Sequence, residues 1–141
     1  MRGSQKALPI RIAVIFLSFA VITFYEISIF TPNRIEYGNV SVEQAKKLIE
    51  SNPFLVIVDV RTDPEFQSDH IEGAINLCVC YEEELLKGLN PNDRILVYCL
   101  SGTTRSAKAM MILNENGYAK VYNMLGGITE WIELGYPVVN G

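Results

Sequence analysis

The sequence predicts an α/β protein with a mainly parallel sheet and helices on both faces of that sheet. After residue 31, short apolar stretches alternate with helical patterns along the chain. Two of the stretches, 54–60 and 95–98, are nearly unbroken runs of apolar residues, which is typical of strands covered on both faces. Short strands that alternate with helices favour parallel pairing. Ligands of such sheets bind beyond the carboxyl ends of the strands, in the turn to the next helix.

The expected elements follow one another at short spacing. Ser41 and Gln44 form a capping-box pattern that opens a helix over 42–50, and Asn52-Pro53 ends this helix. The later elements are expected to be strand 54–60, a short helical turn capped by Asp63-Pro64, strand 74–77, helix 81–87, strand 95–98, helix 106–116 closed by Gly117, strand 121–123 and helix 128–134 ended by Gly135.

A hydrophobic leader precedes these elements. The stretch 12–30 is interrupted only by Glu26 near one end. As a helix it would be about 28 Å long, which is enough to span a bilayer. We therefore expect residues 1–30 to be an uncleaved transmembrane helix and residues 31–141 to be a single globular domain.

The orientation of this anchor follows from its flanking charges. Arg2, Lys6 and Arg11 all precede or begin the apolar stretch, so the positive-inside rule places the N-terminus in the cytoplasm and the domain outside it, at the cell membrane. A cleaved signal peptide, which would leave a secreted or periplasmic domain, is the main alternative. No small-x-small cleavage site follows the stretch. A buried helix of a soluble protein is a third interpretation.

Composition excludes several classes of partner and site. Residues 31–141 hold nine basic and fifteen acidic side chains, a net charge of −6, which is unsuited to neutralising nucleic-acid phosphates. Three cysteines are too few for a disulfide-stapled scaffold. The chain has one histidine, so a site with several histidine ligands is excluded. We expect no metal, no cofactor and no nucleic acid.

The most specific motif is the loop that follows the strand at 95–98. Cys99 begins this loop, and a helix follows it. The loop residues after the cysteine are Leu100, Ser101, Gly102, Thr103, Thr104, Arg105 and Ser106. Small and polar residues allow the backbone to curl with its amides inward, as an anion-binding nest at a helix N-terminus.

Cys99 is the predicted nucleophile of this loop. The helix dipole, the inward amides and the Arg105 guanidinium all favour the thiolate over the thiol. The same amides can hold an oxyanion, a sulfur atom or a phosphoryl group transferred to the cysteine. The alternative is a buried structural cysteine with a solvated Arg105.

The chain resembles the rhodanese-like domain family. The matching stretches are Asp59-Val60-Arg61 with Glu65-Phe66, 70–76, the cysteine loop, Gly126-Gly127 with Trp131, and 135–138. The resemblance implies a fold around a parallel five-stranded sheet, with Cys99 as the sulfur-accepting nucleophile. It also implies sulfur transfer in two steps. A donor such as thiosulfate leaves a persulfide on Cys99, and an acceptor thiol or cyanide then takes the outer sulfur.

The loop departs from the family in one respect. Single-domain rhodaneses commonly carry C-x-x-G-x-R-S, whereas this chain has C-x-x-G-x-x-R-S. The longer C-x5-R spacing is similar to that of protein tyrosine phosphatases, cell-cycle phosphatases and fungal-type arsenate reductases. A larger ring of amides suits a tetrahedral oxyanion, but Tyr98 replaces the phosphatase histidine and 100–104 contains no carboxylate to act as general acid.

Three functions therefore stay open, in order of preference. The first is a sulfurtransferase, the second is a phosphatase or arsenate reductase acting on an oxyanion, and the third is a non-catalytic sulfur-binding or redox module. Among neighbouring residues, Asp59 and Arg61 are expected to form a structural ion-pair network with Glu65. His70 is expected to make a hydrogen bond that fixes the fold.

Cys78 and Cys80 are the remaining cysteines. We expect their side chains to point to opposite sides of the segment, and we therefore expect no bond between them. They are predicted to be small apolar residues at a strand end. The alternative is that one of them is a resolving thiol that accepts sulfur from Cys99 or forms a disulfide with it.

Overall fold

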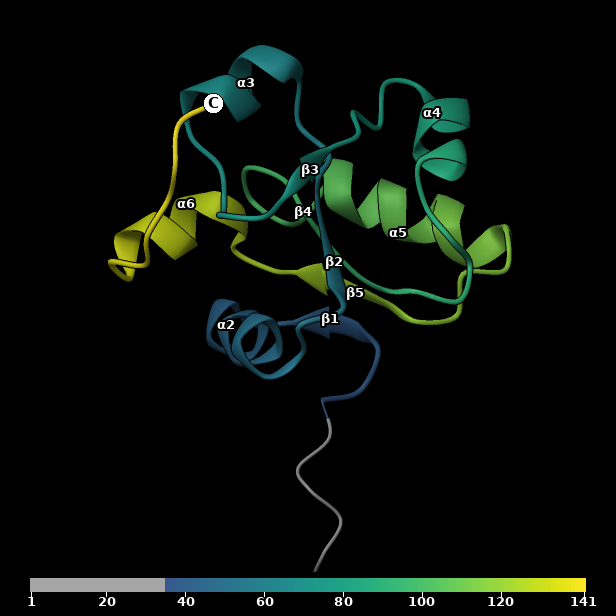
Figure 1. Ribbon diagram of the computed structural model, residues 1–141, viewed down its shortest axis with the longest axis horizontal. Coiled ribbons are helices and arrows are strands. Elements are labelled where there is room, and N and C mark those ends of the chain that lie inside the picture. The colour runs from purple at the N-terminus through teal and green to yellow at the C-terminus, as the bar shows by residue number, and fades with distance from the viewer. Residues whose placement is uncertain (1–34) are drawn as a thin grey trace, which may run out of the picture. The chain divides into compact units, whose positions relative to one another are not determined.

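The computed structural model describes residues 35–141 (Figure 1). The predicted anchor or signal peptide falls outside these residues. Within 35–141, no helix is both long enough and apolar enough to cross a membrane. In chain order the elements are β1 (Gly38–Val40), α2 (Val42–Ser51), β2 (Leu55–Asp59), α3 (Asp63–Ser68), β3 (Ile75–Asn76), α4 (Glu82–Lys87), β4 (Arg94–Tyr98), α5 (Arg105–Glu115), β5 (Val121–Met124) and α6 (Gly127–Glu133).

The five strands form one sheet in the order β1-β5-β4-β2-β3, and every pair is parallel. This confirms the expected parallel five-stranded sheet. Asp59 at the end of β2 pairs with Tyr98 at the end of β4. The next residue continues the pairing, since Val60 N–H donates to the Tyr98 carbonyl at 3.0 Å. The carboxyl ends of these two strands therefore meet at one edge of the sheet, where Cys99 begins its loop.

Helices cover both faces of the sheet, as expected. One buried cluster joins the α2 and α6 side chains to alternate sheet residues such as Leu96, and the other joins α4 and α5 to residues such as Val97. Leu96 and Val97 are consecutive and both are fully buried. Because successive side chains of a strand point to opposite faces, β4 is covered on both sides. Each such apolar side chain contributes about 1.5–3 kcal/mol when fully buried.

Several local predictions are confirmed and others are wrong in detail. The capping box of α2 is present, since Gln44 N–H donates to Ser41 Oγ at 3.3 Å and Ser41 N–H donates to Gln44 Oε1 at 2.9 Å. The N-cap of α3 is Thr62 and not Asp63, because Glu65 reaches back to Thr62 as the other half of a second capping box. Phe54 lies outside β2 and is 90% exposed.

Strand β1 was missed altogether. Its three residues, 38–40, contain a glycine and an asparagine and give no apolar run. It exists because it pairs in parallel with β5, from Gly38 opposite Tyr122 to Val40 opposite Met124. An edge strand this short is determined by its neighbour and not by its own sequence.

Candidate active site

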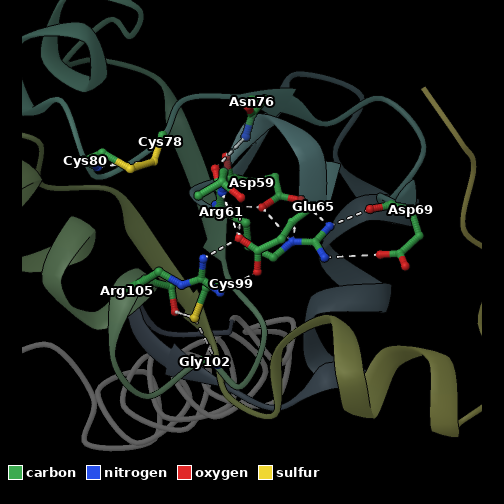
Figure 2. A network of polar contacts seen from close by, with 12 residues as sticks. Asp59, Arg61, Glu65, Asp69, Asn76, Cys78, Cys80, Cys99, Gly102 and Arg105 are labelled. Carbon is green, nitrogen blue, oxygen red and sulfur yellow. Dashed lines mark hydrogen bonds and ion pairs between the residues drawn. A yellow bond between two sulfur atoms is a disulfide. The ribbon is translucent and has the colours of Figure 1, made fainter. Parts of the chain in front are cut away.

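Cys99 lies at the carboxyl end of β4, at the start of the loop that leads into α5 (Figure 2). The side chain is almost fully buried, with 2% of the residue exposed. Its Sγ accepts a hydrogen bond from Gly102 N–H at 3.3 Å and lies 3.3 Å from Ser106 Oγ. The loop thus curls around the sulfur atom and provides both a backbone and a side-chain hydrogen-bonding group.

The start of α6 holds the first two residues of the loop. Ile128 N–H donates to the Cys99 carbonyl at 2.9 Å, and Thr129 N–H donates to the Leu100 carbonyl at 3.1 Å. A Cβ on Gly127 would lie 2.4 Å from both carbonyl oxygens, so only glycine permits this approach. These carbonyls are therefore turned toward α6, and the Ser101 and Gly102 amides are turned toward the sulfur.

The middle of the loop is held by β5. Gly102 has a φ of +75°, in the left-handed region that favours glycine, and a Cβ there would lie 2.1 Å from the Met124 carbonyl oxygen. Its own carbonyl accepts a hydrogen bond from Asn123 Nδ2 at 2.9 Å. The same nitrogen donates to Asn39 Oδ1 at 2.9 Å. Two neighbouring strands, β1 and β5, thus fix the position of the Gly102 amide.

The surroundings of Cys99 stabilise its thiolate. Burial raises the pKa of this thiol, but hydrogen bonds from the Ser106 hydroxyl and from the Ser106, Gly102 and Ser101 amides outweigh burial and lower the pKa overall. Donors directed at a sulfur atom stabilise the charged form, which is the nucleophile. Cys99 is also the free cysteine among the described residues.

Other loop residues form the outer surface. Ser101, Thr103 and Thr104 are exposed, and Ser101 Oγ lies 3.0 Å from Thr103 Oγ1. Leu100 is 49% exposed although it is apolar. Gly102 and Ser106 face inward and are buried. The loop thus has a polar ring around the sulfur and a mixed outer rim.

Arg105 is the first residue of α5, and its guanidinium pairs with a carboxylate from α3 (Figure 2). Nη1 donates to Glu65 Oε2 at 2.6 Å and Nη2 donates to Glu65 Oε1 at 2.8 Å. Glu65 raises the pKa of Arg105, burial opposes this, and the charge of Cys99 makes a smaller contribution that also raises it. Arg105 therefore lies within electrostatic range of Cys99, but both terminal nitrogens are used by Glu65.

The expected network of Asp59, Arg61 and Glu65 is wrong in one member. Arg61 Nη2 donates to Asp59 Oδ2 at 2.7 Å and Nη1 donates to Asp69 Oδ1 at 3.1 Å, with Arg61 and Asp59 both buried. Asn76 Nδ2 also donates hydrogen bonds to the carbonyl oxygens of Asp59 and Arg61. Glu65 belongs instead to Arg105, because its position on α3 directs it toward the start of α5.

His70 makes contacts that stabilise the fold. Its Nδ1 lies 2.9 Å from the Phe66 carbonyl oxygen, and its ring stacks on Phe66 with centroids 3.8 Å apart. Its backbone forms an antiparallel bridge with Val139. His70 thus joins the end of α3 to the C-terminal segment.

The expectation that Cys78 and Cys80 do not bond to each other is wrong. The structure joins them in a disulfide, with their Cα atoms 5.1 Å apart (Figure 2). Side chains two positions apart point to the same side even in an extended segment, so the expected opposite orientation was wrong. Here the two cysteines also lie in a turn closed by Tyr81 N–H donating to the Cys78 carbonyl at 3.1 Å. A resolving role for either thiol stays a prediction, and it would require this disulfide to be reduced first.

Comparison with known proteins decides the family. A family model described as a rhodanese-like domain matches residues 41–134. The chain belongs to the rhodanese-like domain family. This domain is 37% identical over 117 residues to thiosulfate sulfurtransferase 18 of Arabidopsis thaliana, and the match covers 73% of this chain and 84% of that protein.

Two further relatives extend the comparison of this rhodanese-like chain. A rhodanese-related protein from Thermoplasma volcanium, known from its crystal structure, is 30% identical with a TM-score of 0.66, covering 74% of this chain and 100% of that one. A Bacillus subtilis protein named as a candidate sulfur carrier is 34% identical over 99 residues and 70% of this chain. The chain spans 53% of the length of that relative.

The structure also shows contacts that sequence reasoning missed. The Thr62-x-x-Glu65 pattern is a capping-box signature, and it could have indicated that Glu65 begins a helix next to the loop. No sequence signal indicated that Glu65 pairs with Arg105 or that Asn123 holds Gly102. Within residues 35–141, no group of three or more His, Cys, Asp or Glu could hold a metal ion.

Proposed function

We propose that this rhodanese-like domain is a sulfurtransferase that carries sulfane sulfur as a persulfide on Cys99. The observation that supports this most directly is the ring of donors around Sγ, which includes the Gly102 amide at 3.3 Å and the Ser106 hydroxyl at 3.3 Å. A nucleophilic thiol needs a lowered pKa, and these groups lower the pKa of Cys99 against the effect of its burial.

The first half-reaction loads the cysteine. The Cys99 thiolate attacks the outer sulfur of a donor such as thiosulfate, the sulfur–sulfur bond of the donor breaks, and sulfite leaves with the bonding electron pair. The new terminal sulfur carries negative charge, and we expect the amides of the loop to stabilise it.

The second half-reaction unloads the cysteine. An acceptor thiolate or cyanide attacks the terminal sulfur, and the Cys99 thiolate leaves with the electron pair of the persulfide bond. The hydrogen bonds that lower the pKa of Cys99 also make it a better leaving group. Small donor and acceptor molecules are therefore the proposed partners.

Oxyanion chemistry, as in a phosphatase or arsenate reductase, is the second candidate because of the C-x5-R spacing from Cys99 to Arg105. In such chemistry an arginine commonly forms a bidentate pair with the oxyanion. Here both terminal nitrogens of Arg105 already donate to Glu65, and this counts against the oxyanion candidate. A non-catalytic sulfur-binding or redox module is the third candidate.

Mass spectrometry of the full-length chain after incubation with thiosulfate tests the proposal. We expect the added mass of one sulfur atom on Cys99, lost again on addition of cyanide with release of thiocyanate. The matched Cys99→Ser variant, which is nearly isosteric, should show neither the adduct nor the transfer. Turnover of arsenate or an aryl phosphate by a chain that never forms the adduct would instead favour the oxyanion candidate.

We also propose that residues 1–30 anchor the domain to the cell membrane, with the domain outside the cytoplasm. The support is the length of the apolar stretch and the basic residues that precede or begin it. Secretion or release to the periplasm after signal cleavage is the alternative.

A further inference from the structure

We propose that Glu65 is a specificity-determining residue, which neutralises Arg105 and thereby disfavours doubly charged anions at the Cys99 loop. This inference rests on the proposed function, because it concerns which sulfur donors the loop accepts. The inference assigns a role to the Glu65 carboxylate, which forms an ion pair with Arg105 of the loop.

The contact between the two side chains is bidentate. Both terminal nitrogens of Arg105 donate to Glu65, one to each oxygen, at 2.6 and 2.8 Å. Glu65 is in turn held by Thr62, whose N–H and Oγ1 donate to Oε2 at 3.0 and 2.7 Å. Such a fork-to-fork pair fixes both partners in direction, and its net charge is zero.

The second arginine near the loop is neutralised as well. Arg61 acts on the pKa of Arg105 through its charge, so the two guanidinium groups are within electrostatic range. Arg61 is 2% exposed and forms ion pairs with Asp59 and Asp69. Neither arginine therefore offers an unpaired positive charge to a ligand at Cys99.

The sulfur atom is then surrounded mainly by uncharged donors. The groups that contact or act on Sγ are the Gly102 and Ser106 donors and the Ser101 amide. Neutral hydrogen-bond donors stabilise a single charge on a transferred sulfur, but a second negative charge on a donor would have no cation to compensate its lost hydration.

The rim of the loop supports the same conclusion. Leu100 is 49% exposed and Leu125 is 39% exposed. Leu100 belongs to the loop, and Leu125 lies close to its backbone, since a Cβ on Gly102 would lie 2.7 Å from the Leu125 Cα. The rim is mixed, since Ser101, Thr103 and Thr104 are exposed as well. Exposed leucines beside uncharged donors fit an organic persulfide, R–S–SH, which carries at most one charge on its terminal sulfur, better than the thiosulfate dianion.

Glu65→Gln is the variant that tests the inference. Glutamine keeps an oxygen that can accept from Thr62 N–H, so the cap of α3 is retained, while the charge that neutralises Arg105 is removed. Thiosulfate binding is measured by titration calorimetry on the full-length chain carrying Cys99→Ser, which prevents reaction. We expect Glu65→Gln to raise thiosulfate affinity by about tenfold, as one charge-assisted contact becomes available.

Two controls isolate the effect of the pair. Glu115→Gln removes the same charge from an exposed residue at the opposite end of α5 and should leave thiosulfate affinity within about twofold, because solvent screens distant charges. Adding Arg105→Met to Glu65→Gln should abolish the gain. The thiosulfate affinity of the chain that keeps Glu65 should also depend only weakly on salt concentration. This measurement requires no substitution of Glu65.

Donor selectivity is the second measurement. With Cys99 present, Glu65→Gln should raise kcat/KM for thiosulfate by about tenfold and change kcat/KM for benzyl hydropersulfide by less than about twofold. Unchanged or weaker thiosulfate binding in Glu65→Gln overturns the inference, because Glu65 would then position Arg105 for the anion. Steep salt dependence with Glu65 present overturns it as well. If neither donor forms a persulfide on Cys99, the proposed function is refuted. The binding measurement still tests the role of Glu65, because it does not need the reaction.

Discussion

Gly102 is the residue at which the loop turns its backbone toward the Cys99 sulfur. Its φ of +75° and the 2.1 Å between its missing Cβ and the Met124 carbonyl oxygen leave room for a hydrogen atom only. Its amide donates to the sulfur while its carbonyl is held by Asn123. Gly102 therefore connects strand β5, through its contact with Asn123, to the sulfur of the nucleophile.

We predict that Gly102→Ala lowers both stability and activity. The left-handed backbone costs about 1–2 kcal/mol for a residue with a Cβ, and displacement of the Met124 backbone adds to this. Urea unfolding and sulfur transfer from thiosulfate measure the two effects.

Gly117→Ala is the matched control for this prediction. Gly117 has a φ of +88°, but a Cβ there would meet nothing within 4 Å. This variant should show the backbone cost alone and keep its activity. Equal unfolding free energies and equal rates for the two variants would show that the contact of Gly102 with β5 does not matter.

At the scale of elements, the ion pair of Glu65 and Arg105 connects the starts of α3 and α5. Each helix follows a strand whose carboxyl end is at the same sheet edge, so the two N-termini lie close together. Glu65 favours the start of α3 as a cap and by its charge. The site is thus assembled from two helix starts and the beginning of a third, α6.

This pair predicts a dependence of stability on pH. The hydrogen bonds from Arg105 lower the pKa of Glu65 from its ordinary 4.5 to about 2. Burial raises this pKa, and the hydrogen bonds from Thr62 lower it further. Because the pKa is lower in the folded state, the stabilisation is complete above about pH 4.5 and is lost as the pH falls toward about 2. Its size is about 1 kcal/mol, since both side chains are partly exposed and solvent screens them.

Urea unfolding of the wild type and of Glu65→Gln over this pH range measures the effect. The other carboxyl groups titrate in both proteins, so the difference in unfolding free energy isolates Glu65. We expect the difference to be present near pH 5 and to vanish toward pH 2. A difference that is constant with pH would contradict the ion pair.

At the scale of the whole molecule, the parallel sheet places the chemistry at one edge. The strand ends of β2, β4 and β5 direct Arg61, Cys99 and the Gly126-Gly127 turn to this edge. The leader lies outside the described residues, and its proposed role as an anchor is to be tested on the full chain.

We predict that the full-length chain fractionates with membranes at its full mass. A cysteine-free topology reporter fused after Gly141 should report a C-terminus outside the cytoplasm, because the basic residues flank the N-terminal side of the apolar stretch. Recovery of a soluble form shortened by roughly 25 to 30 residues would show signal cleavage instead.

The sequence by itself determined those features that depend on neighbouring residues. Apolar runs such as 95–98 identified buried strands, and the Ser41 capping pattern identified the start of α2, because periodicity and caps act within a few residues. The Cys99 loop was recognisable for the same reason, since its glycine and polar residues are contiguous and a single turn of backbone directs their amides.

Only the tertiary structure decided which distant residues complete the site. Glu65 and Arg105 are 40 positions apart, and their pairing depends on the register that brings the ends of β2 and β4 together. Cys78 and Cys80 lie in a turn that follows the end of β3. Pairing across the fold depends on the path of the whole chain, which no local pattern of residues specifies.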